Sequence, residues 1–249
     1  MNVDLPDRVG DKFFDALVGA LEIQTDKKGT VEKVRQALGA DCGFDILMSL
    51  EQIQSQHNEI LIALRGFDGR NLGLFKAPTV EELILSVKSY VISWATLVDM
   101  LSGLINKVFD LGLADVDVKF DLILRNKHVI NSDLREIFDN YRTTLDMKAM
   151  KSHRNEIVHR GMIKDQEVIS FYKGRNALQA KRYSFLRTDH ISEEEYKNES
   201  AQQTKELFDL SARKKAYYEA HYKATLEMID KALACLGRKS VEPHKTKTI

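Results

Sequence analysis

Residues 151–161, KSHRNEIVHRG, place two histidines, two arginines, an asparagine and a glutamate around a single apolar pair. On a helix, Asn155 and His159 lie one turn apart and share a face, which adjoins the face of Arg154. Arginine forks onto phosphate oxygens, an amide orients a group, and an imidazole moves protons near neutral pH. These residue types at this spacing suit phosphodiester chemistry, and such chemistry requires no metal ion.

The same segment also has an apolar stripe if residues 147–160 are helical. The stripe runs through Met147, Met150, Ile157 and Val158. Arg154 lies midway along it, and we expect an anion opposite, because an unpaired buried charge is costly. His153 and Arg160 fall on the opposite face. We name both as candidate substrate-binding residues, with simple solvation as the alternative.

The hexapeptide from Arg154 to His159 resembles the R-N-x-x-x-H form of the arginine-histidine motif of HEPN domains, the higher eukaryotes and prokaryotes nucleotide-binding domains. The resemblance implies an all-α antiparallel bundle of four or five core helices, often a homodimer in which two copies of the motif meet. Many members are metal-independent endoribonucleases of toxin-antitoxin, phage-defence or RNA-processing systems. RNA, a second copy of the chain and an antitoxin or regulatory protein are therefore the implied partners, and no cofactor is implied.

The resemblance also implies catalytic roles for Arg154, Asn155 and His159. His159 would act as general base on the ribose 2′-hydroxyl or as general acid on the leaving 5′-oxygen. Arg154 would stabilise the charged transition state, and Asn155 would position the substrate or the imidazole. The products would be a 2′,3′-cyclic phosphate and a 5′-hydroxyl, and DNA would be inert because it lacks the nucleophile.

Other interpretations of these residues stay open. Arg154 could instead have a structural role, as the partner of Asp99 or Glu136 in an ion pair. His159 could instead be a residue at the C-terminus of its helix that the helix dipole stabilises by about 0.3–1 kcal/mol. In function, the alternative is a non-catalytic helical module that binds a nucleotide, RNA or a protein partner. A further alternative is a bundle that only packs or binds another helix.

The elements that must position the motif are predicted to be helices. Thr79 and Glu82 have the spacing of a capping box and predict the start of a long helix over 79–108, with an apolar seam sustained over about four heptads. Further helices are predicted over 44–64, over 132–161 with a break near Thr143 and Thr144, and over 192–236. His57 lies on the apolar stripe of its helix, where a hydrogen-bonded core role is more common than catalysis.

The remaining segments complete the predicted organisation. Residues 65–78 read as a loop, and a small β-hairpin is expected within an insertion at 162–190, from VISFY and KRYSFL around KGRN. The basic segment 173–187 suits single-stranded RNA and equally an exposed hairpin. We divide the chain into an N-terminal helical extension (1–43), a HEPN-like bundle (44–236) and a disordered basic tail (237–249).

Composition narrows the function classes. Lysine plus arginine and aspartate plus glutamate each total 37, so any binding to a polyanion must be local. Phosphate-binding loops, dinucleotide fingerprints, HExxH and CxxC are absent from the sequence. Two distant cysteines and an acidic N-terminus predict a soluble, cytoplasmic protein without a signal peptide, and the charges within 80–113 argue against a membrane span.

Overall fold

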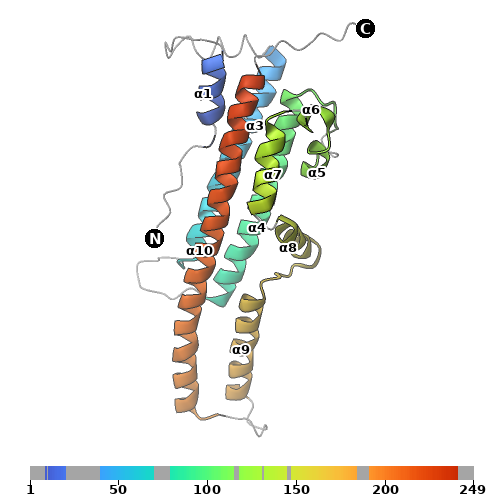
Figure 1. Cartoon of the computed structure of the whole chain (residues 1–249). Helices are drawn as coiled ribbons and strands as arrows, with labels where there is room; N and C mark the ends of the chain where they lie inside the picture. The colour runs from blue at the N-terminus through green and yellow to red at the C-terminus, as the bar shows by residue number, and fades with distance from the viewer. Residues whose placement is uncertain are drawn as a thin grey trace. The chain divides into compact units, whose positions relative to one another are not determined.

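The computed structural model describes residues 9, 11–20, 40–69, 79–114, 118–130, 132–144, 147–183 and 191–240 of the chain. Within these ranges the chain forms helices and no strand, which confirms the predicted all-α class (Figure 1). The described helices are α1 (Asp11–Ala20), α3 (Ala40–Gly66), α4 (Val80–Val108), α5 (Phe120–Ile123), α6 (Lys127–Ile130), α7 (Leu134–Thr144), α8 (Met147–Arg160), α9 (Gln166–Tyr183) and α10 (Glu193–Lys239).

The helices group into two compact units. Unit 1 comprises residues 1–58, 93–147 and 221–249, and unit 2 comprises residues 59–92 and 148–220. Helices α3, α4 and α10 each contribute to both units. The domain division predicted from the sequence stays a prediction. Parts of it, namely residues 21–39, 70–78 of the predicted loop, 184–190 and 241–249, lie outside the described residues.

Helix α4 begins where the sequence predicted. The amide of Thr79 donates to Glu82 Oε2 at 2.8 Å and the amide of Glu82 donates to Thr79 Oγ1 at 3.1 Å, which completes the capping box. Every position of the predicted seam is buried except Ile84, which is half-buried; the seam runs through Val80, Ile84, Val87, Val91, Trp94, Val98, Leu101, Ile105 and Val108. By length and composition alone α4 is apolar enough to cross a membrane, and half of its most apolar stretch is buried; core helices of soluble proteins meet the same test.

Unit 1 has a polar cluster in its core. In this unit α3 and α4 run in opposite directions (Figure 1). The indole Nε1 of Trp94 donates to Tyr141 Oη at 3.1 Å and to Thr225 Oγ1 at 3.2 Å, and the two oxygens lie 3.0 Å apart. His57 is fully buried, and its Nδ1 hydrogen-bonds the hydroxyl of Tyr222. The predicted core position of His57 is thus confirmed.

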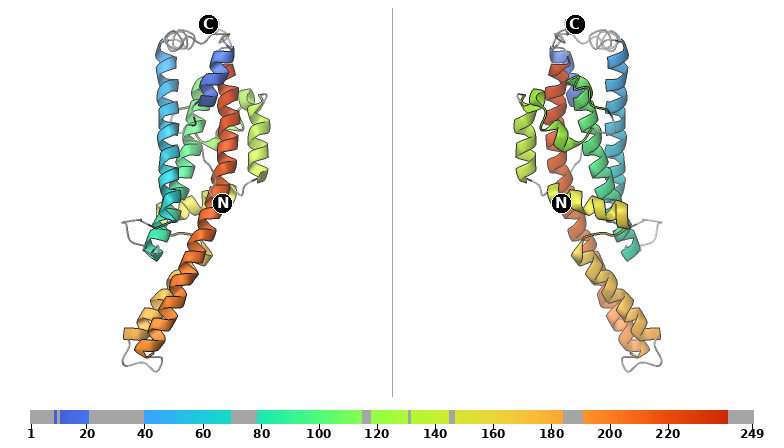
Figure 2. Two further views of the ribbon diagram at one scale, coloured as in Figure 1. Left: turned by 90° about the vertical axis from the view of Figure 1, so that its left-hand side faces the viewer. Right: turned by 90° about the vertical axis from the view of Figure 1, so that its right-hand side faces the viewer.

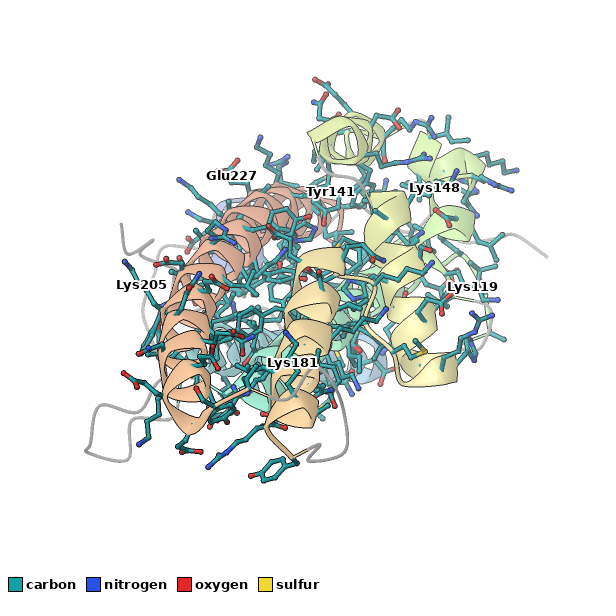
Figure 3. The ribbon with its side chains drawn as sticks, turned by 90° about the horizontal axis from the view of Figure 1, so that it is seen from below. Lys119, Tyr141, Lys148, Lys181, Lys205 and Glu227 are labelled. Carbon is teal, nitrogen blue, oxygen red and sulfur yellow. The ribbon has the colours of Figure 1, made fainter. Side chains whose placement is uncertain are left out.

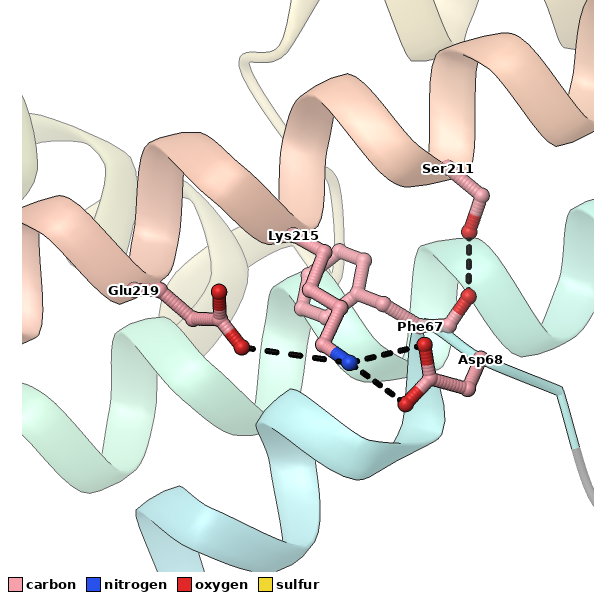
Figure 4. A network of polar contacts seen from close by, with 5 residues as sticks. All are labelled: Phe67, Asp68, Ser211, Lys215 and Glu219. Carbon is pink, nitrogen blue, oxygen red and sulfur yellow. Dashed lines mark hydrogen bonds and ion pairs between the residues drawn. The ribbon is translucent and has the colours of Figure 1, made fainter. Parts of the chain in front are cut away.

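Unit 2 contains α8, α9 and the first half of α10. Helix α9 lies alongside this half of α10, and α8 runs crosswise near the start of α9 (Figures 1 and 2). The residues that follow α3 form polar contacts with α10 (Figure 4). Lys215 Nζ lies 2.6 Å from Asp68 Oδ2 and 3.8 Å from Glu219 Oε1, while Ser211 Oγ donates to the carbonyl of Phe67 at 2.6 Å.

The predicted β-hairpin is wrong for the described part of the insertion. Residues 166–183 form helix α9, and Asp165 Oδ1 accepts from the amide of Val168 at its start. Val168 and Leu178 are buried and Phe171 is half-buried. These residues recur at helical spacing and share one face, so a helix buries them together where a hairpin would alternate its side chains between two faces.

Two other predicted boundaries are confirmed. Helix α7 ends at Thr144 and α8 begins at Met147, so the break near residues 143 and 144 is present. Helix α10 starts after Ser192, whose amide donates to Glu195 Oε2 at 2.8 Å and whose Oγ accepts from the amide of Glu195 at 3.2 Å. This is a second capping box, which fixes the start of the final helix.

Candidate functional site

Helix α8 carries the arginine-histidine motif and ends at a glycine. Gly161 has a φ of +65°, and its amide donates to the carbonyl of Ile157 at 2.9 Å. This left-handed termination costs a glycine little, because it has no Cβ to clash with the backbone. His159 and Arg160 therefore occupy the last turn of α8, where the helix dipole favours positive charge.

The buried face of α8 differs from the predicted stripe. Met147, Met150 and Ile157 are buried as expected, but Val158 is 50% exposed. His153 is only 8% exposed, so its predicted place on the face opposite the apolar stripe is wrong, and Arg154 is half-buried beside it. The physical reason is that a neutral imidazole can be buried at lower cost than a guanidinium, which keeps its charge. Helix α8 is therefore rotated about its axis relative to the prediction, with His153 on the buried side and Val158 on the exposed side.

The three predicted catalytic residues lie on the accessible side of α8. The guanidinium Nη1 of Arg154 donates to Asn155 Oδ1 at 3.3 Å. Asn155 and His159 are exposed and one turn apart. Among the described residues of unit 2, Arg154 makes no ion pair and His159 makes no hydrogen bond, so the half-buried guanidinium and the exposed imidazole keep hydrogen-bonding capacity for a ligand. The structural alternative for Arg154 involves carboxylates of unit 1 and stays a prediction.

Glu156 is a charged neighbour of the motif residues, and the sequence reasoning gave it no role. Its Oε2 lies 3.3 Å from Arg160 Nη1, and its Oε1 lies 3.5 Å from Lys164 Nζ. Lys164 also donates to Ser152 Oγ at 2.8 Å. The one carboxylate within the motif is thus neutralised by two cations, and the turn after α8 is held against the helix. The spacing of Glu156 and Arg160 at i and i+4 was the available signal; nothing local pointed to Lys164.

His153 is influenced by charges of both signs within unit 2. Burial lowers the pKa of its imidazole; the charge of Asp165 opposes this, and Lys164 and Lys214 add to it. Its Nε2 has no hydrogen-bond partner in the described part of the chain. A buried imidazole with a lowered pKa is neutral at neutral pH, so it brings no charge to a phosphate. Its predicted role in substrate binding stays a prediction.

Lys214 connects α10 to the start of α9. Its Nζ lies 2.9 Å from Asp165 Oδ2 and 2.5 Å from Glu167 Oε2. Burial lowers the pKa of Lys214, but the hydrogen bonds to the two carboxylates outweigh it, and the net direction is upward. The hydrogen bond from Lys214 lowers the pKa of Glu167. This ion-pair group holds the segment that follows the motif.

Helices α8 and α9 concentrate positive charge. Residues 147–183 contain nine lysines and arginines and three acidic residues, a net charge of +6 in a chain whose net charge is zero. Lys148 on α8 and Lys181 on α9 are labelled in Figure 3. Local positive charge of this kind attracts a polyanion even when the whole chain is neutral.

The described residues show no cluster of metal-ligating side chains. Among them, no group of three or more histidine, cysteine, aspartate or glutamate side chains is placed to hold a metal ion.

Comparison with known families decides the family of the chain. The model of the HEPN_Cthe2314-like HEPN family matches residues 79–233, which is more than half of the chain. The chain belongs to the HEPN family. The matched part of this HEPN domain runs from the start of α4 into the second half of α10 and includes α8 with Arg154, Asn155 and His159. No curated protein and no solved structure matches the chain.

Proposed function

We propose that this HEPN domain is a metal-independent endoribonuclease whose active site is built on Arg154, Asn155 and His159. The observation that carries the proposal is the presentation of these residues on the accessible side of α8, inside the family match, with His159 uncommitted to any intramolecular hydrogen bond in the described structure. A general base must be able to reach the proton it removes, and a solvent-facing imidazole meets that requirement.

The chemistry follows from the three groups. One imidazole takes the proton of the ribose 2′-hydroxyl as the 2′-oxygen forms a bond to phosphorus. The bond from phosphorus to the 5′-oxygen then breaks, and a protonated group donates a proton to that leaving oxygen. Arg154 stabilises the negative charge that builds on the phosphoryl oxygens, and its hydrogen bond to Asn155 orients the guanidinium.

A single His159 does not supply both a base and an acid in one step. We propose that the HEPN domain works as a homodimer in which His159 of each copy serves one role, as the family resemblance implies. The excess positive charge of residues 147–183 supports RNA as the substrate, because it offers a local attraction for phosphate. A role in a toxin-antitoxin, phage-defence or RNA-processing system, an antitoxin or regulatory protein as partner, and a cytoplasmic location are part of the same proposal.

The proposal is tested by RNA cleavage in EDTA. Wild-type protein, Arg154→Ala and His159→Ala are incubated with mixed RNA, and the fragment ends are analysed. Arg125→Ala and His128→Ala are matched controls, since both residues are exposed and lie outside the motif. We expect 2′,3′-cyclic phosphate ends from the wild type and the controls, and a loss of rate of about 10²–10⁴-fold for His159→Ala.

Two results would contradict the proposal. Equal cleavage by all five proteins would point to a contaminant or another site. RNA or nucleotide binding without cleavage by the wild type would favour the alternative, a non-catalytic module that uses the same cationic surface for recognition.

A further inference from the structure

Helix α9 presents a row of exposed aromatic and amide side chains. Tyr172, Asn176, Gln179 and Tyr183 are all exposed, and they recur at intervals of four, three and four residues. At 3.6 residues per turn this spacing places them on one face of the helix. We call these four residues the α9 stripe. Its two tyrosines lie about 16 Å apart along the helix axis, and Tyr183 is 67% exposed.

Two cations flank the α9 stripe, one on each side. In the described structure neither Lys173 nor Arg175 makes an ion pair. Arg182, the second-last residue of α9, behaves differently, because it pairs with Glu193 at 3.3 Å and lies over the ring of Tyr196 at 4.3 Å. The charges of Lys173 and Arg175 are therefore the ones left for a ligand.

The stripe has a defined place relative to the motif helix. A connection of residues 161–165 joins α8 to α9 within unit 2. Lys164 bonds Ser152 and Glu156 of α8, and Asp165 bonds Lys214 of α10. These contacts hold the start of α9 close to α8, and α9 then extends away from α8 (Figure 1), so a strand bound along α9 has its Tyr172 end nearer to the motif than its Tyr183 end.

We propose that the α9 stripe, with Lys173 and Arg175, binds the single-stranded part of the RNA that α8 cleaves. This inference rests on the proposed function for the identity of the substrate. Unpaired bases stack on the rings of Tyr172 and Tyr183, the amides of the stripe contact base edges, and the two cations contact phosphates. Duplex RNA hides the faces of its bases, so the stripe selects single strands.

Binding is measured by fluorescence anisotropy with the His159→Ala protein as parent, so that the probe is not cleaved. The probe is a short fluorescein-labelled RNA of mixed sequence, used as a single strand and as a duplex. Two double variants of the parent test the stripe: Tyr172→Ala with Tyr183→Ala, and Lys173→Ala with Arg175→Ala. Lys197→Ala with Lys205→Ala is the charge-matched control, since both lysines are exposed on α10 in the same unit.

We expect the parent to prefer the single strand. The tyrosine pair should weaken binding at least about tenfold, because each stacked base contributes on the order of 1–3 kcal/mol. The cation pair should also reduce the slope of log affinity against log salt by about 1.4, as two phosphate contacts are lost. The control should leave the slope unchanged, and circular dichroism should show the same helicity in every variant.

The results separate this inference from the proposed function. Stripe variants that bind like the control would overturn the inference, whether or not the wild type cleaves RNA. Failure of the parent to bind RNA, or equal binding of duplex and single strand, would overturn it as well. Stripe-dependent binding of single strands by a wild-type protein that never cleaves them would uphold the RNA surface and reject the nuclease.

Discussion

The hydrogen-bonded cluster of Trp94, Tyr141 and Thr225 should make two substitutions strongly non-additive. Thr225 Oγ1 donates to the carbonyl of His221 at 3.0 Å, so it accepts from the hydroxyl of Tyr141, and the indole N–H of Trp94 is shared between both oxygens. In Tyr141→Phe the hydroxyl of Thr225 remains as an acceptor for the indole N–H of Trp94, and in Thr225→Val the hydroxyl of Tyr141 remains as that acceptor. Each single variant should therefore lose about 0.5–1.5 kcal/mol of unfolding free energy.

The double variant removes both acceptors and leaves the buried indole N–H of Trp94 without one. Burying an unsatisfied donor costs about 1–3 kcal/mol, so the double variant should be destabilised beyond the sum of the singles by about that amount. Trp94 is the single tryptophan of the chain, and its fluorescence during urea unfolding reports on this cluster directly.

The control cycle combines Thr225→Val with Ser102→Ala. Ser102 is buried in α4, about 12 Å along the helix from Trp94, and its hydroxyl donates to the carbonyl of Val98. This cycle should be additive within about 0.5 kcal/mol. Additivity in the Tyr141 and Thr225 cycle as well would refute the assignment of both oxygens as acceptors for Trp94.

Three further predictions concern stability. Burial lowers the pKa of His221 to about 4, so the contribution of its neutral imidazole to the free energy of unfolding is complete above the unfolded pKa near 6.5 and is lost as pH falls toward 4. In urea unfolding at pH 7 and at pH 5, the free energy of unfolding should therefore fall less between the two pH values for His221→Leu than for the wild type. Gly161→Ala should destabilise the protein by about 1 kcal/mol, because the φ of Gly161 is +65°. Gly174→Ala should stabilise the protein by up to about 1 kcal/mol, since alanine is the better helix former and its Cβ would meet nothing within 4 Å. Calorimetry that gave both changes the same sign would contradict this prediction. Thr79→Ala should lower the free energy of unfolding by about 1 kcal/mol, because the capping box is lost. Amide hydrogen exchange in the first turn of α4 should become faster, and unchanged exchange would count against the capping role of Thr79.

Local signals in the sequence predicted the helix starts well. The capping boxes at Thr79 and Ser192 join residues only three apart, so the hydrogen bonds that begin α4 and α10 depend on short segments alone. Gly161 ended α8 for a similarly local reason, because a left-handed residue is needed there. The same locality made the motif residues recognisable, since Arg154, Asn155 and His159 lie within one and a half turns.

The insertion shows where local signals fail. The β-branched and aromatic residues of VISFY and the KGRN sequence have the composition of a hairpin, yet α9 is helical. Its buried face packs beside α10, and Arg182 and Glu167 form ion pairs with Glu193 and Lys214. Those partners lie up to 47 residues away in the chain. A propensity of a few tenths of a kcal/mol per residue is easily outweighed by such packing.

The sequence by itself predicted the helical class, the starts of α4 and α10 and the residues of the candidate site, because these depend on spacing within a few turns. The tertiary structure alone decided which side of α8 is buried, and so exchanged the predicted exposure of His153 and Val158. It also brought Trp94 to Thr225, 131 residues apart. Burial depends on what the rest of the chain places against a helix, and no pattern within one helix contains that information.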